Sequence, residues 1–324
     1  MATEDRQHPV GGVDYPRTLQ EFDAWFPTEA ACAAYIKRLR WGSGFRCPGC
    51  GGSEAWLTTR SELRCSACQR QPSVTAGTIF EGTRKPLRTW LLTMWFVTNE
   101  KLGGSALGLQ RLLGLGSYQT AWTWLHKLRR AMVRPGRELL TGVVEVDETY
   151  LGGVEQSVHG RETETKSIVV IAVELREPKG FGRVRLRRVP DVSGNSLVGF
   201  VREVIKPGAV VRTDGWKGYD SLPKHGYERQ KINLAASESP AHVVMPAVHR
   251  VASLLKRWLL GTHQGSVSGK HLDYYLDEYT FRFNRRASKA RGLLFFRLLQ
   301  QAVRTPPVTY RGIVGPGEAA DHKR

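Results

Sequence analysis

The sequence predicts an α/β protein in which a mixed sheet flanked by helices follows a cysteine-rich module and a helical segment. Three observations support this fold class. Four of the five cysteines form two CxxC pairs within residues 47–68. Residues 86–134 place apolar side chains three or four positions apart, which is helical spacing. From Val143 onward strand-like runs appear and helices return after them, as in a sheet covered by helices.

The N-terminal region divides into a lead-in and a small module. Residues 1–17 lack a periodic apolar pattern, and we expect them to be flexible. From Thr18 to Arg40 apolar residues recur at helical spacing, and the cysteine-rich segment follows directly. We therefore expect an N-terminal helix and a cysteine-rich module over residues 18–83.

The two CxxC pairs predict a structural zinc site. Cys47 and Cys50 form the first pair, Cys65 and Cys68 form the second, and the segment between them suits a short hairpin. Each pair presents two sulfurs to one point, and four thiolates complete the tetrahedral shell that Zn²⁺ prefers. An odd number of cysteines in a reducing compartment argues against disulfides. Since four thiolates leave no open coordination position, we expect this zinc to stabilise the fold and not to catalyse a reaction.

Two helical runs joined by a glycine-containing turn lie within residues 86–134. Residues 105–113 form the first run and residues 118–132 the second. The layout is typical of a helix-turn-helix, whose second helix contacts base edges near its start and phosphates near its end. The alternative is an ordinary helical hairpin packed on a core. The candidate DNA contacts are Gln119, Thr120, Thr123, Lys127, Arg129 and Arg130.

The charge of the chain favours a polyanionic partner. It has 48 Lys and Arg against 30 Asp and Glu, which gives a formal net charge of +18. Nucleic acid is the usual partner of such a chain, because Lys and Arg release counterions condensed on phosphates. A solvated basic surface and an anionic membrane surface are the alternatives. No apolar run reaches the ~18 residues of a membrane span and no signal-peptide pattern is present, so we expect a cytoplasmic protein without a membrane segment.

The second half of the chain predicts the sheet. Four strand-like runs cover residues 142–150, 166–175, 182–190 and 209–214, and helical runs cover residues 193–205, 249–263 and 270–284. We expect one mixed sheet covered by helices over residues 140–303. Residues 304–324 are rich in Pro, Gly and charge, and we expect them to be disordered.

Carboxylates mark the ends of two predicted strands. Glu145 and Asp147 lie on one face of the first strand, because alternate residues share a side, and Asp214 ends the fourth strand. Carboxylates that converge from neighbouring strands bind divalent cations, and two such ions activate a water or sugar hydroxyl against a phosphodiester. A turn or helix-cap role for each aspartate is the alternative.

The order of these motifs resembles the ISXO-like insertion-sequence transposases. The motifs are the two CxxC pairs, a helical linker, VEVDETYLGG, RTDGWKGY, HRVASLLKRWLLGTH and YLDEYTFRFNRR, and the resemblance covers residues 18–303. The resemblance implies a zinc ribbon joined to an RNase H-like domain of the DDE type, with Mg²⁺ or Mn²⁺ as catalytic ions. It also implies cleavage at the terminal inverted repeats of a mobile element and transfer of the freed 3′-hydroxyl into target DNA. A homo-oligomer on DNA, associated with the nucleoid, is a further implication.

The resemblance also assigns candidate catalytic residues. Asp147 corresponds to the first metal ligand and Asp214 to the second. In related families the third ligand is a Glu seven residues before a Lys or Arg, and here His249 stands seven residues before Lys256. We expect His249 as the third ligand, although imidazole suits softer ions better than Mg²⁺. We expect Lys256, on the same helix face, to contact a phosphate.

Other residues complete the set of candidates. The carboxylates that replace His249 if it is not a ligand are Glu145, Glu148, Asp277 and Glu278. The candidate contacts to the DNA backbone at the end of FRFNRR are Arg282, Arg285 and Arg286. Two further functions remain open for the whole chain. One is a catalytically inactive DNA-binding relic that uses the ribbon and the helix-turn-helix, and the other is a nuclease without strand transfer.

Overall fold

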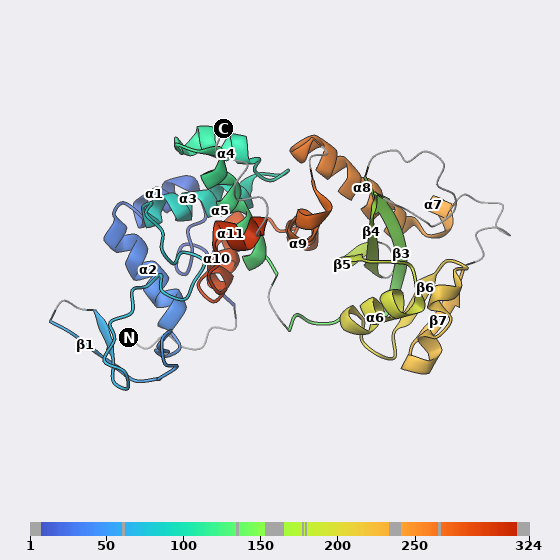
Figure 1. Ribbon diagram of the computed structural model, residues 1–324, viewed down its shortest axis with the longest axis horizontal. Helices are drawn as coiled ribbons and strands as arrows, with labels where there is room; N and C mark the ends of the chain where they lie inside the picture. Colours follow the sequence, from blue (N-terminus) through green and yellow to red (C-terminus); the bar gives the residue numbers. More distant parts are fainter. Residues whose placement is uncertain are drawn as a thin grey trace. The chain divides into compact units, whose positions relative to one another are not determined.

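The computed structural model describes two compact units. The described residues are 8–59, 62–133, 136–152, 165–176, 178, 180–232, 241–264 and 267–315. Met1–Arg134 with Ser288–Arg324 form the first unit, which we call the helical unit, and Pro135–Ala287 form the second, which we call the sheet unit. The helical unit therefore contains both ends of the described chain (Figure 1).

The helical unit contains most of the helices and the cysteine-rich hairpin. The region that we expected as one helix from Thr18 to Arg40 forms two, because Pro27 interrupts the backbone hydrogen bonding and the Thr28 hydroxyl caps the next helix by accepting from the Ala31 N–H. The bounds are α1 Leu19–Trp25, α2 Glu29–Trp41, β1 Ala55–Leu57, β2 Leu63–Cys65, α3 Leu87–Asn99, α4 Ala106–Leu113, α5 Tyr118–Ala131, α10 Arg291–Ala302 and α11 Tyr310–Val314.

Helix α10 joins the helical unit and not the sheet unit. The ring of Phe295 packs against those of Phe22, Phe26 and Trp95 at centroid distances of 5.7, 6.1 and 5.6 Å. Burial of large aromatic side chains is strongly favourable, so this packing places α10 in the helical unit. The expected boundary of the sheet domain at residue 303 is therefore wrong, and the sheet unit ends at Ala287.

The described parts of both expected flexible ends are ordered. Tyr15 is buried, with its ring 5.7 Å from that of Phe296, and a Cβ atom on Gly292 would lie 1.8 Å from the Pro16 carbonyl oxygen. Near the other end, Ile313 and Val314 are buried in α11. Residues 8–17 and 304–315 thus differ from the expectation of disorder because apolar side chains anchor them, while residues 1–7 and 316–324 lie outside the described part.

The sheet unit is built on five strands in the order β5-β4-β3-β6-β7. Strands β3, β4 and β5 form an antiparallel meander, and β6 and β7 run parallel to β3. This mixed sheet confirms the predicted fold class. The bounds are β3 Val143–Leu151, β4 Ser167–Leu175, β5 Phe181–Val189, α6 Gly194–Val204, β6 Val210–Thr213, β7 Glu228–Lys231, α7 Ala241–Val244, α8 Pro246–His263 and α9 Leu272–Asn284.

Helices cover the sheet on opposite faces (Figure 1). Alternation along β3 sends Val144 and Val146 into the core under α6. Alternate residues of β4 and β5 meet α8 and α9 on the other face. Since Glu145 and Asp147 alternate with the two valines, they point to the face that carries α8. The sheet thus directs the first candidate ligand toward the helix of His249.

Strand β7 is the element of the sheet that the sequence does not predict. Its four residues, ERQK, are polar and mostly exposed, so they carry neither the alternation nor the apolar run of a strand. The strand forms instead because its backbone pairs with β6, at the edge of the sheet. Among the described residues, no helix combines the length and the apolarity needed to cross a membrane.

Candidate active site and zinc site

Two tight turns bring the four cysteines together. In the first turn the Gly51 N–H donates to the Cys47 carbonyl, and in the second the Gln69 N–H donates to the Cys65 carbonyl. Gly51 and Gln69 both have positive φ angles, of 76° and 59°. The pairing of β1 with β2 confirms the hairpin expected between the turns, although Arg60 and Ser61 lie outside the described residues.

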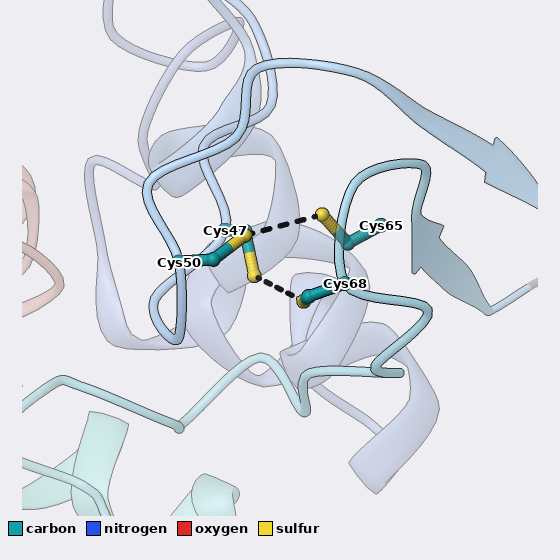
Figure 2. A group of neighbouring side chains, drawn as sticks. All are labelled: Cys47, Cys50, Cys65 and Cys68. Carbon is teal, nitrogen blue, oxygen red and sulfur yellow. Dashed lines mark hydrogen bonds between the residues drawn. The ribbon is translucent and has the colours of Figure 1, made fainter.

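The sulfur positions fit a tetrahedral zinc ion. Cys47 Sγ lies 3.7 Å from Cys68 Sγ, and Cys50 Sγ lies 3.6 Å from Cys65 Sγ (Figure 2). Sulfurs about 2.3 Å from one Zn²⁺ would stand about 3.8 Å apart. Desolvation raises the pKa of the Cys47 thiol, but hydrogen bonds from the backbone N–H groups of Gly49 and Cys50 and from neighbouring thiols lower it to about 6. A thiolate at neutral pH is the form that binds zinc.

The candidate catalytic residues lie on three elements of the sheet unit. Asp147 is in β3, and its Oδ1 accepts a hydrogen bond from the Glu148 N–H at 2.9 Å. Asp214 directly follows β6, the parallel neighbour of β3. Glu145 of β3 pairs with Arg212 of β6 in the parallel register, so the two aspartates each stand two residues beyond this pair.

The loop after β6 is held in place by Arg229 of β7. Its guanidinium donates to the carbonyl oxygens of Asp214 at 3.1 Å and Trp216 at 2.9 Å, and it forms an ion pair with Asp220. The Asp214 side chain accepts from the Trp216 N–H at 3.0 Å, the turn role that was the alternative to metal binding. No sequence pattern marks Arg229, because β7 itself is not predicted.

Helix α8 presents His249 to Asp147. Its buried side chains include Val251, Leu255 and Trp258, and the opposite side includes the exposed Lys256. His249 Nε2 lies 3.9 Å from Asp147 Oδ2. The expected sharing of a helix face between His249 and Lys256 fits this burial pattern, so the structure brings two of the three candidate ligands together.

The three candidate ligands are more widely spaced than the cysteines. In the part of the chain that the structure describes, only the four cysteines form a group of three or more ligand atoms that all lie within 4.8 Å of one another. Asp147, Asp214 and His249 do not form such a closed group. Their joint role as ligands of divalent ions therefore stays a prediction.

Glu145, the first substitute for His249, has a structural contact. Its Oε2 accepts from the N–H groups of Ala247 and Val248, at 2.8 and 3.1 Å, and its Oε1 lies 3.8 Å from Arg212 Nη1. Burial raises the pKa of this carboxyl, whereas the two amides and the guanidinium oppose that rise. The sequence does contain a signal for the contact, because Met245 cannot cap the helix and leaves its first amides in need of an acceptor.

The other substitutes also contact groups away from Asp147. Glu148 accepts from the Tyr219 hydroxyl at 3.0 Å, and Glu278 is buried in an ion pair with Arg282 at 2.7 Å. Burial raises the pKa of Asp277 to about 7, with Arg137 opposing this shift. These contacts give Glu148 and Glu278 structural partners of their own, and His249 as the third ligand stays a prediction.

The predicted DNA contacts on α5 divide by exposure. Gln119 is exposed, and Thr120, Thr123 and Arg130 are half-buried. Arg129 is 2% exposed. The prediction that Arg129 contacts DNA is wrong, because a guanidinium inside the helical unit cannot reach a phosphate.

Lys127 is half-buried, and its Nζ lies 3.4 Å from the Ile79 carbonyl oxygen. Burial lowers the pKa of Lys127, while Glu81 opposes this shift. The helix–turn–helix layout itself is present, since α4 ends at Gly114 in the left-handed conformation and α5 begins after Ser117.

The basic residues at the end of α9 make contacts within the protein. Arg282 pairs with Glu278, and the Arg286 guanidinium donates to the carbonyl oxygens of Gly182 and Phe283. Arg285 donates to the Phe281 carbonyl oxygen at 3.2 Å. A DNA phosphate would have to share or replace these contacts, so DNA binding at this segment stays a prediction.

Two protein families match separate parts of the chain. Residues 27–71 match the transposase zinc-ribbon domain, and residues 139–284 match the ISXO2-like transposase domain. The second range agrees with the sheet unit, which ends at Ala287, and not with the expected end at residue 303.

Two curated proteins are similar over most of their own length. The chain is 28% identical over 278 residues to an "uncharacterized protein in transposable element ISH50" of Halobacterium salinarum. The aligned region covers 79% of this chain and 91% of the relative. It is also 27% identical over 112 residues to an "uncharacterized transposase-like protein" of Haemophilus influenzae. That aligned region covers 35% of this chain and 89% of the relative. The chain thus contains a match to a transposase zinc ribbon followed by a match to an ISXO2-like transposase domain, and over 79% of its length it is similar to a protein of a transposable element.

Proposed function

We propose that the protein cleaves DNA at the ends of its insertion sequence and joins the freed ends to target DNA. The observation that carries this proposal is the approach of His249 on α8 to Asp147 on β3, at 3.9 Å, where β3 adjoins β6, the strand that Asp214 directly follows. Two carboxylates and an imidazole from three elements form a set of hard and intermediate ligands for divalent ions. The match to an ISXO2-like transposase domain supports DNA as the substrate.

Asp147, Asp214 and His249 would hold Mg²⁺ or Mn²⁺. Such ions supply a nucleophile at neutral pH and stabilise the oxygen that leaves the phosphorus. Asp147 lies between the other two elements, because β3 is the neighbour of β6 and packs against α8. Its carboxylate would therefore supply the ligand from the strand that adjoins both β6 and α8.

Two phosphoryl transfers make up the reaction. In the first, water attacks the phosphorus at the element end, the bond to the 3′ oxygen breaks, and that oxygen takes a proton and becomes a free 3′-hydroxyl. In the second, this hydroxyl attacks a phosphorus of target DNA, forms a new phosphodiester and releases a target 3′-hydroxyl. The number of phosphodiester bonds is unchanged in the second step, so it needs no external energy source.

Lys256 would contact the DNA strand close to the site. It is exposed, and it lies two helical turns after His249 on the open side of α8. An ammonium group binds a phosphate as a compact point charge without demanding a fixed geometry.

We further propose that the zinc ribbon and α5 bind the terminal repeats, and that two or more chains assemble to pair the two ends.

Cleavage of labelled element ends tests the proposal. The protein is incubated with a duplex that contains one terminal repeat, with Mg²⁺ or Mn²⁺, and the strands are separated by size. The wild type is expected to nick at the junction with flanking DNA. Asp147→Asn and Asp214→Asn are each expected to lower the rate at least 10³-fold, because an amide does not replace a charged ligand.

The matched control is Asp220→Asn. Asp220 lies in the same loop as Asp214, pairs with Arg229 and is not a proposed ligand. It is expected to retain most of the cleavage rate. Absence of cleavage by the folded wild type with either ion, on DNA that it binds, would contradict the proposal and favour a DNA-binding protein without catalysis.

A further inference from the structure

Helix α8 begins without a cap of its own. Met245 occupies the capping position and makes no side-chain hydrogen bond there, and Pro246 follows it. The next two amides, of Ala247 and Val248, point to Oε2 of Glu145 at 2.8 and 3.1 Å. Helix amides in a buried position need an acceptor, and here a strand residue 102 positions away supplies it.

The same carboxylate also faces β6. Its Oε1 lies 3.8 Å from Nη1 of Arg212, the residue directly opposite in the parallel register. Glu145 is fully buried, whereas the Arg212 side chain is 30% exposed. One carboxylate therefore contacts α8 through one oxygen and β6 through the other, while its own backbone belongs to β3.

Each contact lies next to a proposed metal ligand. Glu145 stands two residues before Asp147 on β3, and Arg212 stands two residues before Asp214. The two capped amides directly precede His249 on α8. We propose that Glu145 is a positioning residue that sets the spacing of the three ligands by joining their elements one layer below the site. This inference rests on the proposed function.

A direct ligand role for Glu145 makes a different prediction from a positioning role. A positioning role depends mainly on the acceptor that reaches the α8 amides at 2.8 and 3.1 Å, because the 3.8 Å contact with the partly exposed Arg212 is longer than a hydrogen bond and is the weaker link. Chain length therefore matters more than charge. Glu145→Gln keeps the length and one acceptor oxygen, whereas Glu145→Asp keeps the charge and is one methylene shorter. A metal ligand would show the reverse order, because metal binding to oxygen favours a charged carboxylate.

Binding of Mn²⁺ to the zinc-loaded, full-length protein separates the two roles. The dissociation constant is measured by isothermal titration calorimetry without DNA. Partners that orient metal ligands typically change metal affinity 10- to 100-fold when they are lost. Glu145→Asp is expected to weaken Mn²⁺ binding at least tenfold, and Glu145→Gln is expected to stay within about threefold of the wild type. Amide hydrogen exchange over residues 247–250 should accelerate in Glu145→Asp only.

Glu174→Asp is the matched control. Glu174 lies on the neighbouring strand β4, accepts from the Thr141 N–H at 3.0 Å and pairs with Arg183, but it has no contact with α8 among those described. Shortening it is expected to lower stability and to leave Mn²⁺ affinity unchanged.

Three results would overturn the inference. Wild-type affinity in folded Glu145→Asp, or equal weakening in Glu145→Gln and Glu145→Asp, would contradict the positioning role alone. A wild type that binds no Mn²⁺ would contradict the proposed function, and the inference with it.

Discussion

At the scale of single residues, His249 is the unusual member of the site. The sequence places it where related families have a Glu, and the structure places its Nε2 3.9 Å from Asp147 Oδ2. Imidazole binds intermediate ions better than it binds Mg²⁺, which prefers oxygen and keeps several waters. The identity of this one ligand therefore bears on which ion supports the reaction.

His249→Glu tests this consequence. The wild type is expected to cleave faster with Mn²⁺ than with Mg²⁺, and the variant is expected to raise the Mg²⁺ rate relative to the Mn²⁺ rate by roughly tenfold. Initial cleavage rates at saturating concentrations of each ion measure the ratio. His249→Ala should be slow with both ions, and a His249→Ala rate equal to that of the wild type would remove His249 from the site.

Residue-scale patterns predict some contacts and miss others. Cys47, Cys50, Cys65 and Cys68 are predictable because zinc imposes a spacing that is visible in the chain. Arg129 is predicted incorrectly, because a basic residue near a helix end looks the same in sequence whether it faces DNA or the core. Its burial depends on how neighbouring helices pack, and a local pattern does not contain that information.

At the scale of elements, helix α9 contains a half-buried acid, Asp277, that links stability to pH. Burial raises the pKa of Asp277 to about 7, Arg137 opposes the shift and Asp273 adds to it. In the unfolded chain the carboxyl titrates near its ordinary value of 3.8. Between pH 4 and 7 the unfolded state therefore loses a proton that the folded state keeps, and the stability of the fold falls as the pH rises through this window.

Asp277→Asn is expected to remove this part of the pH dependence. As the pH rises from 4.5 to 8, the free energy of unfolding of the variant should increase relative to that of the wild type. The increase should be on the order of 2 kcal/mol after allowing for partial solvation. Urea unfolding followed at the two pH values measures the difference. Glu228→Gln, at an exposed position on β7, is the control and should show no such gain. An equal effect of both variants would contradict the assignment.

Strands and helices whose apolar residues recur at a regular spacing can be predicted from the sequence, but the contacts between them cannot. The apolar alternation of β3 and the capping serine of α6, Ser193, are local signals, and both elements appear where they are expected. Strand β7 exists because β6 offers it a backbone partner, and α10 packs on the helical unit because of distant aromatic side chains. Such contacts join residues far apart in the chain.

At the scale of the whole molecule, two units have separate sources of stability. The sheet unit has apolar cores on both faces of its sheet. The cysteine-rich hairpin of the helical unit has only the short β1 and β2 strands, so we expect it to depend on a zinc ion held by its four cysteines. A structural Zn²⁺ site contributes its binding free energy directly to folding.

Removal of zinc is therefore expected to unfold the ribbon and to spare the sheet unit. Dialysis against a strong chelator should release about one Zn²⁺ per chain, which metal analysis can count. Amide exchange should rise over residues 46–70 and stay unchanged in β3 and β4. Cys65→Ser should reproduce the effect. Protected ribbon amides in metal-free protein would contradict a zinc-dependent fold.

The central claim is that Asp147, Asp214 and His249 share a divalent-ion site on the sheet unit. A crystal of the protein soaked in Mn²⁺, with anomalous diffraction collected above the manganese absorption edge, tests it most directly. We predict anomalous peaks in contact with the carboxylates of Asp147 and Asp214, one of them also in contact with Nε2 of His249. Peaks that involve other carboxylates, or occupied Mn²⁺ sites elsewhere and none at these three residues, would contradict the claim.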